Sequence, residues 1–129
     1  MINVDISLNQ EGQVTDVEMS GHADSGEYGK DLVCAGASAV VFGATNAIIG
    51  LTDETPDIDY SDDGGYFHIR SVNLENEQAQ TLLQGLIISL KTIEEEYGQY
   101  IKLNYKWGVT HVKIKLTILR IEKRGRFYT

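Results

Sequence analysis

The chain has one cysteine, one proline and one tryptophan among its 129 residues. A single thiol cannot form an internal disulfide, so the fold does not depend on a disulfide framework, and a reducing compartment is expected. The first residues, MINVD, have neither the basic start nor the apolar run of a secretory signal. Together these absences predict a cytoplasmic protein.

Basic residues are scarce in most of the chain. Residues 1–97 carry 18 of the 19 acidic side chains but only three bases, whereas residues 98–129 carry eight bases and one acid. An acidic surface repels nucleic acid and attracts basic proteins, although the same charge can serve only to keep a domain soluble. We therefore expect no direct nucleic-acid partner, and both a basic protein partner and a merely solvated surface stay open.

The length suits one domain with a modest core. Residues 1–106 are predicted to form that domain. Residues 107–129 form a basic tail, because composition changes abruptly there. The tail could be a further strand, a partner-binding arm, or residues added by translation past the normal end of the gene.

Alternating apolar and polar residues predict five strands. They are expected at residues 2–8, 14–20, 57–61, 66–72 and 100–106. Turn signals after the first and third strands predict two hairpins. A second helix, capped by Asn73 and stopped by Gly98, is expected between the fourth and fifth strands. The order β-β-α-β-β-α-β indicates an α+β domain, with two helices packed on a mostly antiparallel sheet.

The first helix is predicted from a run without charge, Leu32–Thr52. The run is long enough to suggest a membrane span, but polar residues interrupt it and acidic residues flank it. We interpret it as a helix buried on most of its sides, in which Gly36, Gly43 and Gly50 let a sheet or a second helix approach. No association with a membrane is expected.

Cys34 is the candidate nucleophile, because we expect this helix to begin between Asp31 and Cys34. At a helix N-terminus the backbone dipoles favour a thiolate. The free N–H groups there could also hold the oxyanion that forms when a thiolate attacks a peptide carbonyl. A free cysteine is about as often an inert buried residue, so that alternative stays open.

His22 is the candidate base. It follows Gly21 at the predicted end of the second strand and precedes residues 23–31, a charged loop that we expect to be mobile. An imidazole at this place could face Cys34, or it could simply be solvated. The other two histidines are weaker candidates, since one lies in mid-strand and the other in the basic tail.

Two further residues could support such a site. Ser38 lies one helical turn beyond Cys34. Its hydroxyl could hydrogen-bond the substrate or the pair of Cys34 and His22, or it could bond back to the Cys34 carbonyl. Asp31 could orient His22, or cap the helix beginning near Leu32. A metal site built from the histidine, the cysteine and an acid would lack the usual paired ligand spacing, and no phosphate loop is present. No metal and no cofactor are expected.

The residues around this pair resemble the ribosomal-processing cysteine protease family of Firmicutes and related bacteria. The similarity lies in GHA at residues 21–23, then Gly29, then DLVCA at residues 31–35, followed by Ser38. The expected order of elements agrees with the family from residue 1 to about residue 106. The basic tail departs from the family pattern.

The resemblance implies a cytoplasmic, homodimeric cysteine endopeptidase that removes a short N-terminal extension from a large-subunit ribosomal protein. It makes Cys34 the nucleophile and His22 the general base, with Gly21, Asp31 and Ser38 as supporting residues. The loop between His22 and Cys34 would close over the substrate. The alternative from another class is a non-catalytic acidic module that binds a basic ribosomal protein.

Overall fold

The computed structural model describes the backbone of residues 1–21 and 28–108, and the side chains in these ranges except those of residues 28–31. Within these ranges, five strands and two helices follow one another in the predicted order, which confirms the α+β fold. The strands are β1 (Ile2–Leu8), β2 (Val14–Ser20), β3 (Asp57–Tyr60), β4 (Tyr66–Arg70) and β5 (Ile101–Trp107). The helices are α1 (Tyr28–Leu51) and α2 (Glu77–Tyr97).

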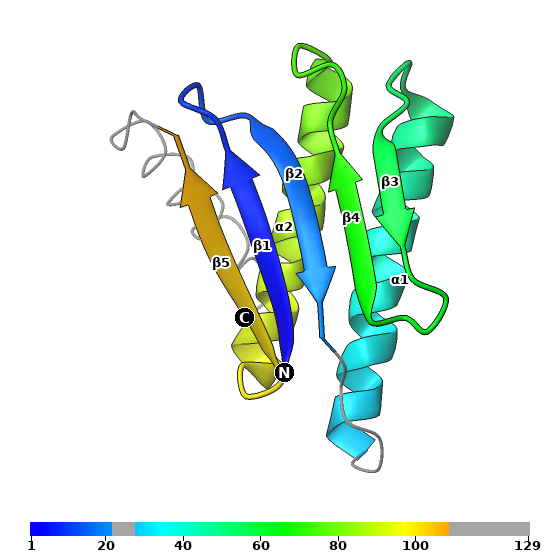
Figure 1. Ribbon diagram of the computed structural model, residues 1–129, viewed down its shortest axis with the longest axis vertical. Coiled ribbons are helices and arrows are strands. Elements are labelled where there is room, and N and C mark those ends of the chain that lie inside the picture. Colours follow the sequence, from blue (N-terminus) through cyan, green and yellow to red (C-terminus); the bar gives the residue numbers. More distant parts are fainter. Residues whose placement is uncertain (22–27, 109–129) are drawn as a thin grey trace.

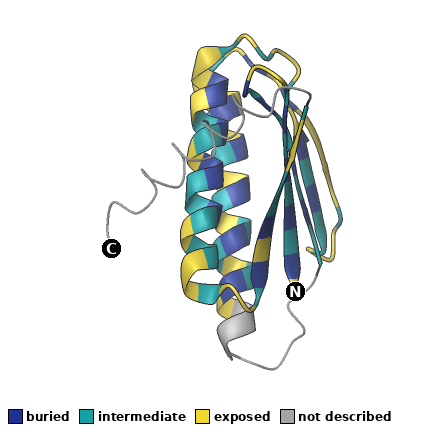
Figure 2. Ribbon diagram, turned by 90° about the vertical axis from the view of Figure 1, so that its left-hand side faces the viewer, coloured by how far each residue is buried: buried dark blue, intermediate teal, exposed yellow. Residues whose placement is uncertain are grey.

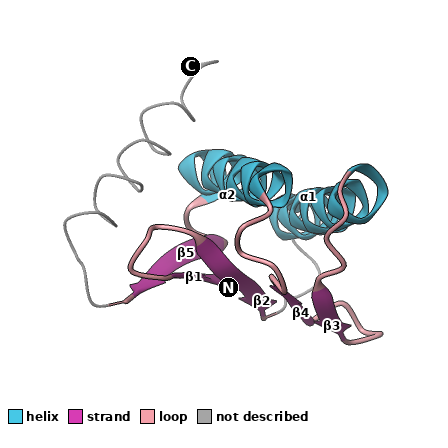
Figure 3. Ribbon diagram, turned by 90° about the horizontal axis from the view of Figure 1, so that it is seen from above, coloured by secondary structure: helices cyan, strands magenta, loops and turns pink. Residues whose placement is uncertain are grey.

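The strands form one sheet in the order β3-β4-β2-β1-β5 (Figure 1). Three neighbouring pairs are antiparallel, and β1 pairs with β5 in parallel. Both helices cover the same face of the sheet, α2 nearer β1 and β5, and α1 nearer β4 and β3 (Figure 3). No described element covers the other face, which we call the open face.

The core lies between the sheet and the two helices (Figure 2). Every second residue of β1 is buried there, and the residues between them lie on the open face, as the alternation predicts. From α2, one stripe faces the same core. Its buried apolar residues are Ala79, Leu83, Leu86, Ile87 and Leu90.

The N-terminus of α2 differs from the prediction. Asn73 was the expected N-cap, but the N-cap is Asn76, whose side chain accepts a hydrogen bond from the N–H of Ala79 at 3.0 Å. The Asn73 side chain instead accepts from the N–H of Glu75 in a local turn. Both asparagines precede acidic residues, so composition alone does not separate them. The C-cap is Gly98, as predicted.

One buried side chain joins α2 to the start of β2. The β1–β2 register shifts between Ser7 and Leu8, and strand pairing is locally interrupted at such an irregularity. The buried amide of Gln80 binds both backbone groups of Val14. The Val14 N–H donates to Oε1 at 2.8 Å, and Nε2 donates to the Val14 carbonyl at 2.9 Å. This clamp fixes how α2 lies across the sheet.

α1 is less buried than predicted. One face of α1 packs on the sheet and on α2, through Val33, Ala37, Val41, Thr45 and Ile48. From Leu32 onward, the other sides of α1 are partly exposed although they carry no charge, and their exposed residues include Leu32, Phe42, Ile49 and Leu51. A helix that shares one face of a sheet with a second helix buries one side only. The prediction of burial on most sides is therefore wrong.

The glycines of α1 only partly do what was predicted. A Cβ added at Gly36 would lie 3.8 Å from Cδ1 of Ile93 on α2, so this glycine does face the second helix. Gly43 and Gly50 have nothing within 4 Å of an added Cβ, so their predicted role in close packing is wrong.

Among the described helices, the segment Leu32–Leu51 is long and apolar enough to cross a membrane by length and composition alone. Core helices of soluble proteins satisfy the same test. One side of this segment, including Val41 and Ile48, packs into the domain core. The packed side therefore agrees with the prediction of a core helix.

Candidate active site

The candidate residues belong to the end of the domain where β2 ends and α1 begins (Figure 1). β2 ends at Ser20, Gly21 follows, and residues 22–27 connect to α1. The N–H of Gly21 donates to the carbonyl of Gly65 at 3.1 Å, which ties this end of β2 to the turn before β4. His22 lies outside the described residues, so its contact with Cys34 stays a prediction.

Gly21 occupies a position that only glycine fits. Its φ is 103°, a backbone conformation that other residues rarely adopt. A Cβ added there would overlap the carbonyl oxygen of Met1. Gly21 therefore lets β2 pass close to the start of β1, and it sets the direction in which the chain continues to His22.

α1 begins earlier than predicted, at Tyr28. Residues 23–31 were expected to be a loop, but residues 28–31 are helical, and residues 22–27 lie outside the described ranges. Cys34 is thus the seventh residue of α1, where the N–H bonds to the carbonyl four residues before it. The predicted oxyanion site built from the N–H groups of Cys34 and the next residues is wrong. The free N–H groups belong to the residues that begin α1, near Tyr28, one to two turns before Cys34.

The early start of α1 also changes the interpretation of Asp31. The residue lies in the first turn of α1, not before it, so the predicted N-cap role is wrong. Its side chain is outside the described part of the structure. The role of orienting His22 therefore stays a prediction.

Cys34 lies on the side of α1 that faces away from α2. Its side chain is half-buried and packs against the edge of the core. Gly36, on another side of the helix, faces Ile93 of α2. The side chain of Cys34 is therefore not fully buried, and whether the thiol is reactive or inert stays a prediction.

Cys34, Ser38 and Phe42 form one row along α1, because residues four apart follow one another on the same helix face. The Phe42 end of this row is fixed against the sheet. Its ring centroid lies 5.8 Å from that of Tyr60 on β3 and 5.3 Å from that of Phe67 on β4, both edge to face. We call these three residues of α1 the catalytic row, after the candidate nucleophile at its start. It runs toward the β3 side of the domain.

The hydroxyl of Ser38 differs from the other helical hydroxyls. In the described helices, hydroxyls that donate to the carbonyl four residues before them belong to Thr45, Thr81, Ser89 and Thr92. The structure places no such bond from Ser38 to Cys34 within the described part of the chain. Of the two roles left open from the sequence, this favours a hydroxyl available to a substrate.

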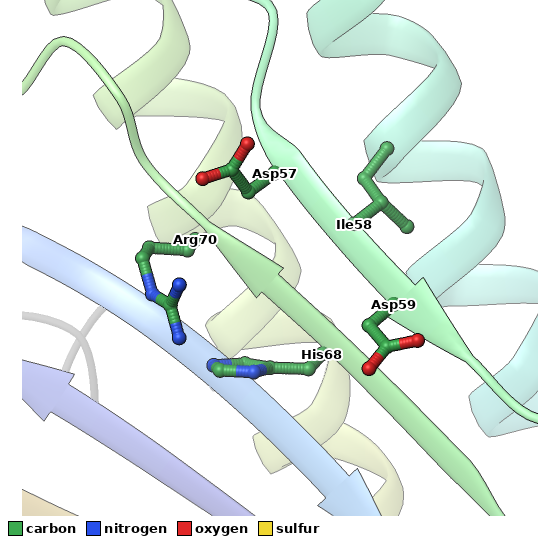
Figure 4. A pocket seen from close by; sticks show the side chains of 5 residues that line it. All are labelled: Asp57, Ile58, Asp59, His68 and Arg70. Atoms are coloured by element: carbon green, nitrogen blue, oxygen red, sulfur yellow. The ribbon is translucent and has the colours of Figure 1, made fainter.

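A second group of polar residues lies on the open face, away from the catalytic row. A shallow pocket there is lined by Asp57, Ile58, Asp59, His68 and Arg70 (Figure 4). Across the β3–β4 pair, Asp57 stands opposite Arg70 and Asp59 opposite His68, while Nε2 of His68 lies 3.4 Å from Oδ2 of Asp16. The pocket thus mixes both signs of charge. Among the described residues, no group of three or more His, Cys, Asp or Glu could hold a metal ion.

A lone, half-exposed thiol stands on a helix, with a free hydroxyl one turn away and a histidine following the neighbouring strand. On an α+β fold of this kind, a thiol, a hydroxyl and an imidazole are the residue types expected of a cysteine protease. Comparison with known proteins identifies the family.

The family description for cysteine protease Prp matches residues 1–102. The ribosomal processing cysteine protease Prp of Staphylococcus aureus is 67% identical over 106 residues, which cover 82% of this chain and all of that protein. Its counterpart in Bacillus subtilis is 44% identical over 107 residues, 80% of this chain and 96% of that protein. A crystal structure of the S. aureus protease with a covalently linked product peptide has a TM-score of 0.77, at 67% identity, over 82% of this chain and 100% of that chain. The chain belongs to the Prp family of cysteine proteases, as the resemblance predicted.

The sequence did not predict the contact between the rings of Phe42 and Tyr60. One signal was present, because Phe42 lies four residues beyond Ser38 and so continues the row that begins at Cys34. The sequence does not tell which side of α1 turns toward β3, and without that information Phe42 reads as one more core residue.

Proposed function

We propose that this protein is a cytoplasmic cysteine endopeptidase that removes an N-terminal extension from a large-subunit ribosomal protein. Cys34 is the nucleophile and His22 is the general base. The observation that carries the proposal is the half-exposed thiol of Cys34 at the end of the domain to which β2 leads His22. The ribosomal-processing names of the relatives and the peptide covalently linked in the S. aureus crystal structure support it.

The chemistry follows from a thiol and an imidazole within reach of each other. The imidazole of His22 takes the proton of the Cys34 thiol, and the sulfur attacks the carbonyl carbon of the scissile bond. The protonated imidazole then gives its proton to the leaving amine as the C–N bond breaks, which leaves a thioester. Water, deprotonated by the same imidazole, hydrolyses the thioester to a carboxylate and restores the thiol.

The supporting residues act around this pair. Gly21 directs the chain toward His22 because of its positive φ. The hydroxyl of Ser38 donates a hydrogen bond to a substrate carbonyl. If it does, Ser38→Ala lowers kcat/KM by about 2- to 10-fold, the usual size for one neutral hydrogen bond. Asp31 orients the imidazole, and its replacement by Asn shifts the pH dependence of kcat/KM.

The decisive experiment is replacement of the nucleophile. Cys34→Ala should abolish cleavage of a peptide that spans the extension and the first residues of the mature ribosomal protein. Ala35→Ser, which alters the next residue of the same helix, is the matched control and should keep most activity. Undiminished cleavage by Cys34→Ala would overturn the proposal.

The role of His22 has two natural controls in the same chain. His22→Ala should reduce cleavage strongly and slow alkylation of the lone thiol at neutral pH, since the thiol loses the base that accepts its proton. His68→Ala and His111→Ala should leave both rates nearly unchanged. Equal effects of all three replacements would remove His22 from the mechanism.

We also propose a homodimer, following the resemblance to the family. The uncharged outer face of α1 supports it, because contiguous apolar surface on a small domain is a common site of association. Ala39→Glu places a charge on this face, and should shift the protein to the monomer in sedimentation equilibrium. Glu96→Ala, an exposed change on α2, should not. A wild-type protein that is monomeric at assay concentration would contradict the proposed homodimer.

A further inference from the structure

The outer edge of β3 carries backbone groups without strand partners. The N–H of Ser61 donates to the carbonyl of Tyr66 at 3.1 Å, so these two residues form a hydrogen-bonded antiparallel pair. Such pairs alternate along the strand, and the register places Asp59 opposite His68 in the next one. The N–H and C=O groups of Ile58 and Tyr60 therefore point outward, away from β4.

The two edges of the sheet differ in whether a side chain binds their outward-pointing backbone groups. At the β5 edge, the N–H of Leu103 donates to Oε2 of Glu94 on α2 at 2.7 Å, so a side chain occupies one of the outward-pointing backbone groups. At the β3 edge, no described side chain binds the outward groups of Ile58 and Tyr60, and all four residues of β3 are exposed. An edge left open in this way accepts an additional strand.

The open edge lies next to the catalytic row. The side chains of Ile58 and Tyr60 lie on the helix side of the sheet, in register with Ile69 and Phe67. The rings of Tyr60 and Phe42 meet there, and they remain 56% and 43% exposed. Exposed aromatic rings beside a free strand edge form a ledge that can cover an apolar side chain of an extended peptide. We call Phe42 and Tyr60 the aromatic ledge.

We propose that the β3 edge and the aromatic ledge bind the peptide substrate as an added strand, with the ledge contacting an apolar substrate side chain. This inference rests on the proposed cleavage by Cys34. Phe42 lies eight residues beyond Cys34, which is about 12 Å along the helix axis. An extended peptide covers that distance in about three to four residues. The aromatic ledge therefore contacts the side chain of the third or fourth substrate residue from the scissile bond. Phe42 and Tyr60 are thus specificity-determining residues.

Two peptides that share the scissile bond test the ledge. The long peptide keeps five residues on each side of the bond, and the short peptide keeps two. Tyr60→Thr, which retains a good strand former, should lower kcat/KM for the long peptide by about 5- to 10-fold, the value of one partly buried apolar contact. It should change kcat/KM for the short peptide less than about twofold. Alanine at the third or fourth substrate position should reproduce the loss in the wild-type enzyme.

A matched pair of helix variants separates the ledge from general effects on α1. Phe42→Ala should lower kcat/KM for the long peptide more than for the short peptide. Ile49→Ala should not, since Ile49 is similarly exposed but lies seven residues farther from Cys34. Ile58→Pro tests the strand edge itself, because it removes an outward N–H that does not bond to β4. It should lower kcat/KM for the long peptide more than Ile58→Ala does. If the ratio of kcat/KM for the long peptide to kcat/KM for the short peptide is the same in all these variants, the proposal is overturned.

The ledge and the proposed function can fail separately. Binding of the long peptide to the Cys34→Ala protein does not require catalysis, and Tyr60→Thr in that background should raise Kd by about the same 5- to 10-fold. An unchanged Kd refutes the ledge even when cleavage by Cys34 is established. A raised Kd supports the ledge even if Cys34→Ala were to retain activity, which would refute only the nucleophile.

Discussion

Replacement of Gly21 by alanine tests the geometry that leads β2 to His22. Two costs add at this position. The first is the positive φ, which costs a non-glycine residue about 1–2 kcal/mol. The second is the overlap of the new Cβ with the carbonyl oxygen of Met1, well inside the 3.0 Å that real Cβ atoms keep.

The second cost cannot be relieved by a small shift of β1. The N–H of Ile2 donates to the carbonyl of Tyr100 at 2.8 Å, and the Ile2 side chain is fully buried. Moving the Met1 carbonyl therefore disturbs the β1–β5 pairing and the core behind it. Overpacking of this kind costs about 1–3 kcal/mol, so Gly21→Ala should lose about 2–5 kcal/mol of unfolding free energy.

Gly64→Ala is the control, because it isolates the first cost. Gly64 also has a positive φ, 80°, but nothing lies within 4 Å of an added Cβ. Urea unfolding should therefore show a loss of only about 1–2 kcal/mol for Gly64→Ala. In native buffer, kcat/KM should fall for Gly21→Ala and stay nearly unchanged for Gly64→Ala. Equal loss of stability in the two variants would refute the overlap with Met1.

Two further predictions concern the N-terminus of α2 and the buried clamp. Asn76→Ala removes the side chain that caps α2 and should cost about 1 kcal/mol in urea unfolding, whereas Asn73→Ala should cost clearly less. The reverse order would contradict the observed cap. Gln80→Leu leaves both backbone groups of Val14 buried without this partner, and should cost about 2–4 kcal/mol by the same measurement. Gln84→Leu on the same helix should be nearly neutral, and a similar loss there would argue against a specific clamp.

β1 and β4 were predictable because their burial alternates along the chain. β1 buries Ile2, Val4, Ile6 and Leu8 at every second position, and the sequence shows this pattern directly. The helices were harder. Absence of charge in α1 was interpreted as burial, but an apolar residue need not be buried. How much of α1 is covered depends on how two helices share one sheet face, which local sequence does not encode.

Much of the candidate site was predictable by residue type but not by geometry. Cys34 was singled out as the only cysteine, near an expected helix start, and Ser38 from its spacing of four residues; the structure keeps the two on one helix face. The start of α1 at Tyr28 was not predicted, because Gly29 and the charged residues around it are typical of a loop. The importance of Phe42 and Tyr60 depends on a contact between elements far apart in the chain, and so only the folded structure reveals it.

Tyr66 provides a prediction in which the sign of the pH dependence is set by one contact. Its hydroxyl donates to Oε2 of Glu18 at 2.6 Å, and this bond, with burial and the charge of Glu18, raises the pKa of Tyr66 from 10.0 to about 12. The folded protein thus holds the proton more tightly than the unfolded chain. The contribution to stability is fully present below pH 10 and is lost as the pH rises from about 10 to about 12.

Comparison of the wild type with Tyr66→Phe measures this contribution. The difference between their urea midpoints should be constant below pH 10 and should shrink toward pH 12. The tyrosinate absorbance of the folded wild type should also contain one late-titrating tyrosine that Tyr66→Phe removes. If Tyr66→Phe instead removes a tyrosine that titrates near pH 10, the hydroxyl does not hold its proton against Glu18, and the close contact between β2 and β4 at this end of the sheet does not have the electrostatic consequence assigned to it.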